Sequence, residues 1–160
     1  MKVNRIPWGW VEKYAKEAGL EPDWVAACIM TESNGNPYAV RYEPHFKYLL
    51  NTRIWAEKLG LSVETEEVCQ KTSWGYMQIM GAVARELGFE GHITELLDVQ
   101  VNLKFGTLKL KQLVWKYGNI LDAIAAYNAG SVRKTPGGHY ENQKHVDRFD
   151  AWLRKIKEGH

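Results

Sequence analysis

Apolar residues recur at intervals of three and four along most of the chain, which is the spacing of one face of an α-helix. The pattern predicts helices at about residues 10–18, 22–34, 50–59, 77–87, 98–117, 119–129 and 141–157. Most of them end beside a glycine, which readily adopts the left-handed conformation that closes a helix. Residues 119–129 are apolar nearly all round, so we expect that helix to be buried. The predicted fold class is all-α with a trace of β.

Three segments lack helical spacing. Residues 38–46 include Pro44, and we expect extended chain or a small hairpin there. Residues 62–72 are polar and predict a loop with one short helical turn. Residues 131–139 contain Pro136-Gly137-Gly138 and predict a mobile loop.

Composition adds few constraints beyond a globular chain. With 160 residues, 45% hydrophobic and 25% charged, the chain is long enough for one well-buried core and unlike a disordered segment. We expect one domain over residues 1–160. Cys28 and Cys69 form no CxxC pattern, and the five histidines lack metal-ligand spacing. We therefore expect no metal site and no cofactor, with Cys28 as a small core residue.

Charge is distributed unevenly. Residues 1–103 carry 10 basic and 14 acidic side chains, whereas residues 104–160 carry 11 and 5. A modest basic patch would attract an anionic polymer. The lysines and arginines are, however, dispersed along helices without a recognition motif, which favours solvated helix faces and no nucleic-acid partner.

The beginning of the chain lacks the apolar stretch and cleavage site of a secretory signal. No apolar run is long enough for a membrane span, so we expect no membrane insertion. The protein is then either made in the cytoplasm or secreted with its leader already removed.

Glu32 is the first candidate for chemistry, in the segment Met30-Thr31-Glu32-Ser33-Asn34-Gly35-Asn36-Pro37. The Asn-Gly-Asn-Pro stop places it in the last turn of a helix, with Gly35 in the closing conformation. The negative end of the helix dipole and any apolar surroundings favour the protonated carboxyl group, as a general acid requires. The alternative is an exposed glutamate without a role.

Two further segments place polar groups at helix ends. Ser73-Trp74-Gly75-Tyr76-Met77-Gln78-Ile79 offers hydrogen-bonding groups and flat rings for sugars, although a capped helix start with a core face explains it equally well. In Ala125-Ala126-Tyr127-Asn128-Ala129-Gly130, a hydroxyl and an amide follow an apolar run. Because burying them without partners is costly, Glu32 or a substrate is the natural partner.

Together the three segments resemble the soluble lytic transglycosylase and goose-type lysozyme family, which has a lysozyme-like α fold. The resemblance rests on Glu32-Ser33, on Ser73-x-Gly75-x-Met77-Gln78-Ile79 and on Ala126-Tyr127-Asn128-Ala129-Gly130, in the family's order and spacing. It covers residues 20–132, and the helix at 141–157 follows. Tyr76 departs from the family, which usually has Leu there.

The resemblance implies a peptidoglycan-degrading lytic transglycosylase that acts on the bond between N-acetylmuramic acid and N-acetylglucosamine. Glu32 would be the catalytic acid and base, with a 1,6-anhydro product. The substrate-binding residues would be Ser33, Ser73, Tyr76, Met77, Gln78, Tyr127 and Asn128. The expected partner is the glycan strand, and we expect a monomer.

A hydrolysing enzyme would need a second carboxylate to activate water. Glu43 is the possible one, and a surface pair with Arg41 is its alternative; Asp98 and Asp122 look like helix-start residues. A hydrolysing muramidase, a related chitinase and a noncatalytic glycan-binding module therefore stay open. A stand-alone domain of this kind is typical of a phage endolysin, with a trimmed bacterial enzyme as the other possibility.

Overall fold

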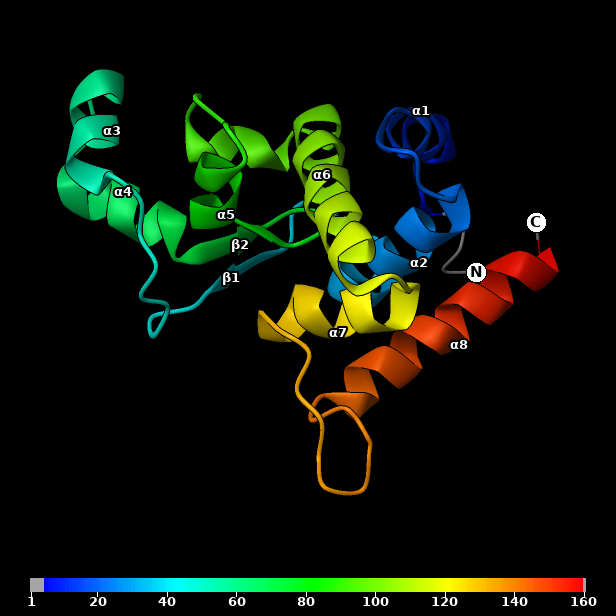
Figure 1. The fold of residues 1–160 in the computed structure, drawn as a ribbon. Coiled ribbons are helices and arrows are strands. Elements are labelled where there is room, and N and C mark those ends of the chain that lie inside the picture. Colours follow the sequence, from blue (N-terminus) through cyan, green and yellow to red (C-terminus); the bar gives the residue numbers. More distant parts are fainter. Residues whose placement is uncertain (1–4, 160) are drawn as a thin grey trace. The chain divides into compact units, whose positions relative to one another are not determined.

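The computed structural model describes residues 5–159, which group into two compact units. Unit 1 combines Met1–Gly35 with Thr107–His160, and unit 2 is Asn36–Gly106. The helices and strands are coloured along the chain in Figure 1. The prediction of one domain stays a prediction.

Unit 1 is built from α1 (Trp8–Ala18), α2 (Pro22–Ser33), the second part of α6 (Val99–Tyr117), α7 (Ile120–Ala129) and α8 (Gln143–Gly159). Helix α8 packs along α2 and α7 (Figure 1). The pattern predicts one apolar side for α2, but every residue from Val25 to Thr31 is buried. Its small alanines and Cys28 let neighbouring helices cover it on all sides.

Helix α7 is buried from Ala123 to Tyr127, which confirms the prediction from its apolar circumference. Asn119 caps it by accepting the N–H of Asp122 at 2.9 Å. The segment between α7 and α8 is closed by an isolated bridge between Lys134 and Tyr140. The Tyr140 hydroxyl also donates a short hydrogen bond to Asp122.

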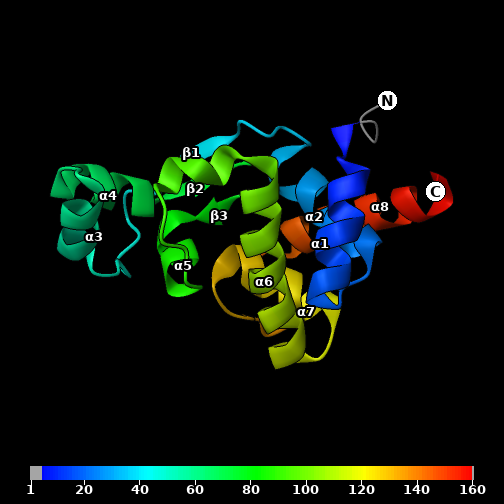
Figure 2. The same cartoon turned by 90° about the horizontal axis from the view of Figure 1, so that it is seen from above.

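Unit 2 contains α3 (Thr52–Leu59), α4 (Val63–Gln70), α5 (Gly81–Glu86), the 3-10 turn Ile93–Leu97 and the first part of α6. Its sheet has the order β1 (Val40–Tyr42), β2 (Thr72–Trp74) and β3 (Ile79–Met80), all antiparallel. The three strands lie side by side in Figure 2. The all-α prediction with a trace of β is confirmed, and β1 falls in the expected extended segment.

Two local predictions for unit 2 are wrong. The polar segment expected to be a loop is largely helix α4, whose buried residues are Glu66 and Gln70. A helix with a polar buried face has no hydrophobic period to detect. The helix expected from Met77 begins only at Gly81, because the residues before it form β2, a turn and β3.

Candidate active site

Glu32 lies in the last turn of α2, as the sequence predicts. Asn34 ends the helix with φ 54°, and its N–H donates to Met30 O at 3.1 Å. Gly35, expected to close the helix, follows it with φ 76°. The Ser33 hydroxyl donates to Ile29 O at 3.1 Å. The side chain of Glu32 is only 12% exposed, so its carboxyl group is mostly shielded from water. The last turn of α2 contains no basic residue.

His145, from the first turn of α8, meets Glu32. Its Nε2 lies 3.0 Å from Glu32 Oε1, and its side chain is 13% exposed. Among residues 5–159, neither atom has a hydrogen-bond partner with good alignment, although both are fully buried. His145 is not among the site residues predicted from the sequence. The available signal was its spacing, since it precedes Phe149 by four residues and so falls on the apolar side of α8.

Lys109 of α6 and Tyr127 of α7 lie close enough to Glu32 for its charge to affect their pKa values. Lys109 Nζ donates to Tyr127 O at 3.0 Å and lies 4.0 Å from the centre of the Tyr127 ring. Burial lowers the pKa of Lys109, while the charge of Glu32 acts in the opposite direction. Burial, Cys28 and Glu32 raise the pKa of Tyr127 well above its usual value, so its hydroxyl keeps its proton at neutral pH.

Cys28 completes this cluster from α2. Its side chain is fully buried, which confirms the prediction of a core residue. Burial and the nearby Glu32 raise the pKa of its thiol well above the usual value, so Cys28 is a neutral, inert neighbour. Lys109 is the basic side chain of this cluster, and its pKa responds to the charge of Glu32.

Asn128 is tied to the start of α8. Asn142 Nδ2 donates to Asn128 Oδ1 at 2.9 Å and to Ala125 O at 3.0 Å. These bonds join the end of α7 to the turn that precedes His145. Asn128 thus has a positioning role in the structure, beside the substrate contact that the resemblance implies.

In unit 2, strand β2 and the turn between β2 and β3 carry the second predicted set of residues. Ser73 is buried and pairs with Met80 across the strands. Gln78 has φ 48°, and its Nε2 donates to Ala39 O at 2.9 Å and to Gly75 O at 3.0 Å. The amide of Gln78 therefore holds the turn against the segment before β1.

Asn102 of α6 fixes this turn from its other side. Its Nδ2 donates to Trp74 O at 2.7 Å and to Leu96 O at 2.8 Å, and its Oδ1 accepts the N–H of Met77 at 2.9 Å. A side chain at Gly75, which has φ 70°, would come within 2.5 Å of Asn102 Nδ2. Asn102 is not among the site residues predicted from the sequence, although its spacing of four from Gly106 places a polar residue on the buried side of α6.

Met77 and Tyr76 differ in how they face solvent. Met77 is fully buried, and its sulfur occupies the space that a side chain at Gly106 would take. Its side chain supports the turn from the buried side. Tyr76 is partly exposed, and burial together with Tyr38 raises its pKa. Tyr38 itself is 75% exposed, so this part of unit 2 presents aromatic rings to solvent.

Glu43 follows β1, where its N–H donates to Lys71 O at 2.8 Å. Its carboxylate lies 2.9 Å from Arg41 Nε, and the two side chains are 38% and 73% exposed. This is the surface pair that the sequence leaves open as an alternative. Asp98 accepts the N–H groups of Gln100 and Val101 at the start of α6, as expected of a helix-start residue.

Comparison with known families gives the arrangement its context. The model of the transglycosylase SLT domain family matches residues 9–148. The chain belongs to this family. A solved structure of an inactive mutant of the lytic transglycosylase Slt from Pseudomonas aeruginosa is also similar, with 21% identity and a TM-score of 0.55. The match covers 91% of this chain and 21% of that one, so the chain spans about a fifth of its length. No curated protein sequence matches the chain.

The structural likeness confirms the fold expected from the resemblance. Within unit 1, this SLT domain brings Glu32 and Tyr127 into one cluster with His145, Lys109 and Cys28. Within unit 2, Ser73 lies on β2, and Tyr76, Met77 and Gln78 lie on the turn that follows it. Each group keeps its own framework of hydrogen bonds.

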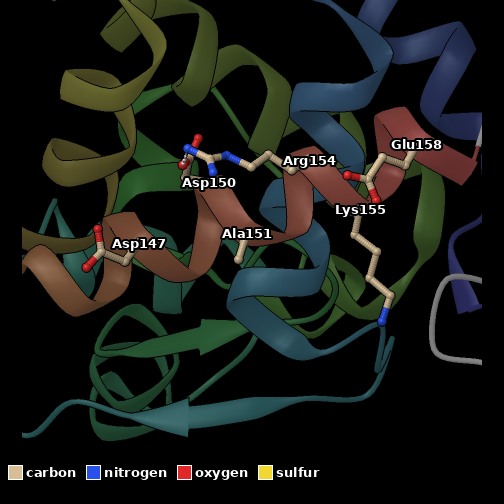
Figure 3. Close-up of a pocket in the computed structure, with 6 residues that line it drawn as sticks. All are labelled: Asp147, Asp150, Ala151, Arg154, Lys155 and Glu158. Atoms are coloured by element: carbon tan, nitrogen blue, oxygen red, sulfur yellow. Dashed lines mark ion pairs between the residues drawn. The ribbon is translucent and has the colours of Figure 1, made fainter.

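Other features of the SLT domain offer less chemistry. A shallow pocket lies along α8, lined by Asp147, Asp150, Ala151, Arg154, Lys155 and Glu158 (Figure 3). Its charged side chains come from one helix, and Arg154 pairs with Asp150 at 2.9 Å, as on a solvated helix face. Within residues 5–159, no three His, Cys, Asp or Glu side chains are grouped to hold a metal. None of the described helices is long and apolar enough to cross a membrane.

Proposed function

We propose that this SLT domain is a lytic transglycosylase that cleaves the β-1,4 bond between N-acetylmuramic acid and N-acetylglucosamine in peptidoglycan. Family membership supports the reaction class. The observation that carries the assignment of the acid is the mostly buried Glu32 carboxyl group at a helix end. Its charge affects the pKa values of the neighbouring Lys109 and Tyr127. A carboxyl group so placed can give and take a proton with little competition from water.

The proposed reaction uses Glu32 twice. Glu32 first gives its proton to the glycosidic oxygen, and the bond from C1 to that oxygen breaks with its electron pair leaving on the oxygen. The substrate's own N-acetyl group stabilises the positive C1. The C6 hydroxyl oxygen then attacks C1 and returns its proton to Glu32, which closes the 1,6-anhydro ring. Atoms and protons balance without water.

Substrate binding is proposed for the remaining residues that the resemblance singles out. Ser33, Tyr127 and Asn128 would bind the sugar and its substituents near Glu32, and Ser73, Tyr76 and Gln78 would bind further along the strand. Met77 would act mainly by supporting their turn, since it is fully buried. Tyr127 suits the neighbourhood of the reacting carbon because its hydroxyl stays protonated and can donate a hydrogen bond.

The central test is clearance of purified cell walls by the wild type and by Glu32→Gln. The amide keeps the shape of the carboxyl group but has no acidic proton, so we expect clearance to be lost. Glu17→Gln is a matched control, because Glu17 is an exposed residue of α1, and it should clear normally. Equal clearance by Glu32→Gln would refute the assignment. If no variant clears but all bind walls, the protein is a glycan-binding module.

Product analysis separates transglycosylation from hydrolysis. Mass spectrometry of the released fragments should show 1,6-anhydromuramic ends, whereas reducing ends alone would establish a muramidase. Glu43→Gln sharpens the comparison. We expect normal clearance because Glu43 pairs with Arg41 at the surface. Loss of clearance in that variant would instead favour the two-carboxylate mechanism.

A further inference from the structure

We propose that His145 is a positioning residue for the general acid, whose imidazole N–H donates to Glu32 Oε1 and leaves Oε2 to face the glycosidic oxygen. The proposal rests on the proposed function and assigns a role that the three family motifs do not include. It makes the reactive unit a carboxyl–imidazole pair with one exchangeable proton.

The two atoms that the proposal joins, Glu32 Oε1 and His145 Nε2, have only each other as a possible partner among residues 5–159. Glu32 Oε1 and His145 Nε2 are 3.0 Å apart, and both are buried without another aligned hydrogen bond among residues 5–159. A buried polar atom without a partner costs about 1–3 kcal/mol. Hydrogen bonds of catalytic groups are often poorly aligned before substrate binds and tighten in the complex. The proposed hydrogen bond would satisfy both atoms.

Three titratable side chains near Glu32 come from three different helices. Cys28 of α2 and Tyr127 of α7 have raised pKa values and stay neutral at neutral pH. Lys109 of α6 has a pKa lowered by burial, with the Glu32 charge opposing that change. In the proposed arrangement the imidazole of His145 is neutral and carries its proton on Nε2.

A neutral imidazole would act at the moment when Glu32 loses its proton. The negative charge then spreads over both carboxylate oxygens, and an N–H near Oε1 stabilises it more than it stabilises the neutral acid. Such a bond strengthens in the transition state, so it lowers the barrier rather than improving substrate binding. The effect should therefore fall on kcat and leave KM nearly unchanged.

The fold holds His145 in place from both sides. Asn142, three residues earlier, bonds to Ala125 O and Asn128 Oδ1. On the other side, Val146 and Phe149 are buried, and α8 packs on α2. An imidazole held this way can orient a carboxyl group through one bond.

Substitutions at position 145 test the role. Leucine removes the donor at similar size, and His145→Leu should lower kcat about 100-fold, the usual effect of losing one transition-state donor. Glutamine places an amide N–H near the position of Nε2, so His145→Gln should keep kcat within about tenfold of the wild type. KM should stay within about twofold in both. His139→Gln, which removes an exposed histidine, is the matched control and should behave as the wild type.

The pH profile provides a readout that a merely structural role would not move. A neutral N–H donor that bonds the charged form of a carboxyl group favours loss of the carboxyl proton. The alkaline limb of kcat should therefore move to higher pH in His145→Leu, which lacks the donor, and stay near its wild-type position in His145→Gln. An unchanged limb in His145→Leu, or equal kcat losses in the Leu and Gln variants with normal folding, would overturn the proposal.

Nuclear magnetic resonance separates this inference from the proposed function. The Nε2–H signal of His145 should shift in the wild type as Glu32 loses its proton, and this step should be absent in Glu32→Gln, whether or not the protein cleaves cell walls. Coupled titration in a protein without activity would refute only the proposed function. Activity with a titration of His145 that ignores Glu32 would refute only the pair.

Discussion

Two buried acid–base pairs show opposite design within one chain. In unit 2, Arg85 Nε lies 2.8 Å from Glu66 Oε1, and both side chains are completely buried. Arg85 Nη1 also donates to Phe89 O and Gly91 O, and its guanidinium lies 4.2 Å from the centre of the Trp55 ring. In unit 1, the Glu32–His145 pair is close but unaligned, and both members are slightly exposed.

The comparison shows that burial has different consequences for the two pairs. A buried ion pair whose remaining hydrogen bonds are filled is costly to break, because removing one partner leaves an uncompensated buried charge. Glu32 and His145 instead keep unfilled hydrogen-bonding capacity and some access to solvent, as the proposed general acid requires. Under the proposed function, stability and reactivity are therefore placed on different pairs.

The largest effect expected is that of Glu32→Gln on the rate. Loss of the proposed general acid should lower kcat by roughly 10³-fold. The free energy of unfolding should stay within about 1 kcal/mol or rise, because the substitution replaces a mostly buried acidic group that the fold does not need. Wall clearance and thermal unfolding measured on one sample check both parts. A large loss of stability would erase the contrast with Glu66.

Arg85→Ala should have the opposite profile. Removing the guanidinium leaves the Glu66 carboxylate buried without its cation, which should cost about 3–5 kcal/mol of unfolding free energy. Urea unfolding measures it, with Arg154→Ala as the control. Arg154 also forms an ion pair at 2.9 Å, but it is largely exposed, and its loss should cost less than about 1 kcal/mol. Similar losses in the two variants would contradict the importance of burial.

Asn102→Ala tests the hydrogen bonds of the turn in unit 2. It would leave the Met77 N–H and the carbonyls of Trp74 and Leu96 without their side-chain partner, at a cost of roughly 2–4 kcal/mol. Lys111→Ala, at an exposed position of α6, should change the unfolding free energy by less than about 0.5 kcal/mol. Urea unfolding compares the two; equal results would mean that Asn102 does not fix the turn.

The smallest effect expected is that of Tyr140→Phe. The Tyr140 hydrogen bond, followed by that of Asn119, lowers the pKa of Asp122. Because the folded pKa is depressed, this stabilisation exists above the unfolded pKa of Asp122 and is lost as pH falls through the folded one. The variant should lose about 1 kcal/mol at neutral pH for this partly exposed bond, and the difference should shrink in acid.

The alkaline side of the same bond gives a second check. Burial and Asp122 raise the pKa of Tyr140 to about 12. A raised folded pKa means that the stabilisation is complete below the unfolded pKa and is lost as pH rises through the folded value. Thermal unfolding of wild type and Tyr140→Phe should therefore converge at both extremes of pH. A difference that does not depend on pH would reveal a packing effect of the hydroxyl.

Much of unit 1 could be predicted because its signals are local. The helix that ends at Asn34 and the apolar run of α7 follow from residue order and spacing alone, and both are confirmed. Glu32 needed only the helix stop after it to be placed in a last turn. His145 could not be assigned to it, because the two residues are far apart in sequence and meet only when α8 packs on α2.

Unit 2 was less predictable because distant polar partners shape it. Helix α4 buries Glu66 and Gln70, which a hydrophobic pattern cannot indicate and which only Arg85 and nearby backbone groups make tolerable. The start of α5 is delayed to Gly81 because Asn102 and Gln78 hold the preceding residues in a turn. Local propensity there yields to tertiary hydrogen bonds.

The sequence by itself determined the helical class, the place of Glu32 at a helix end and the three motifs that mark the family, since each depends on residues close together in the chain. Tertiary structure alone decided which side chains surround Glu32, and it alone gave the buried Glu66 its ion-pair partner Arg85. Those outcomes depend on contacts between distant helices, where burial and the available hydrogen-bond partners fix the charge that each group can carry.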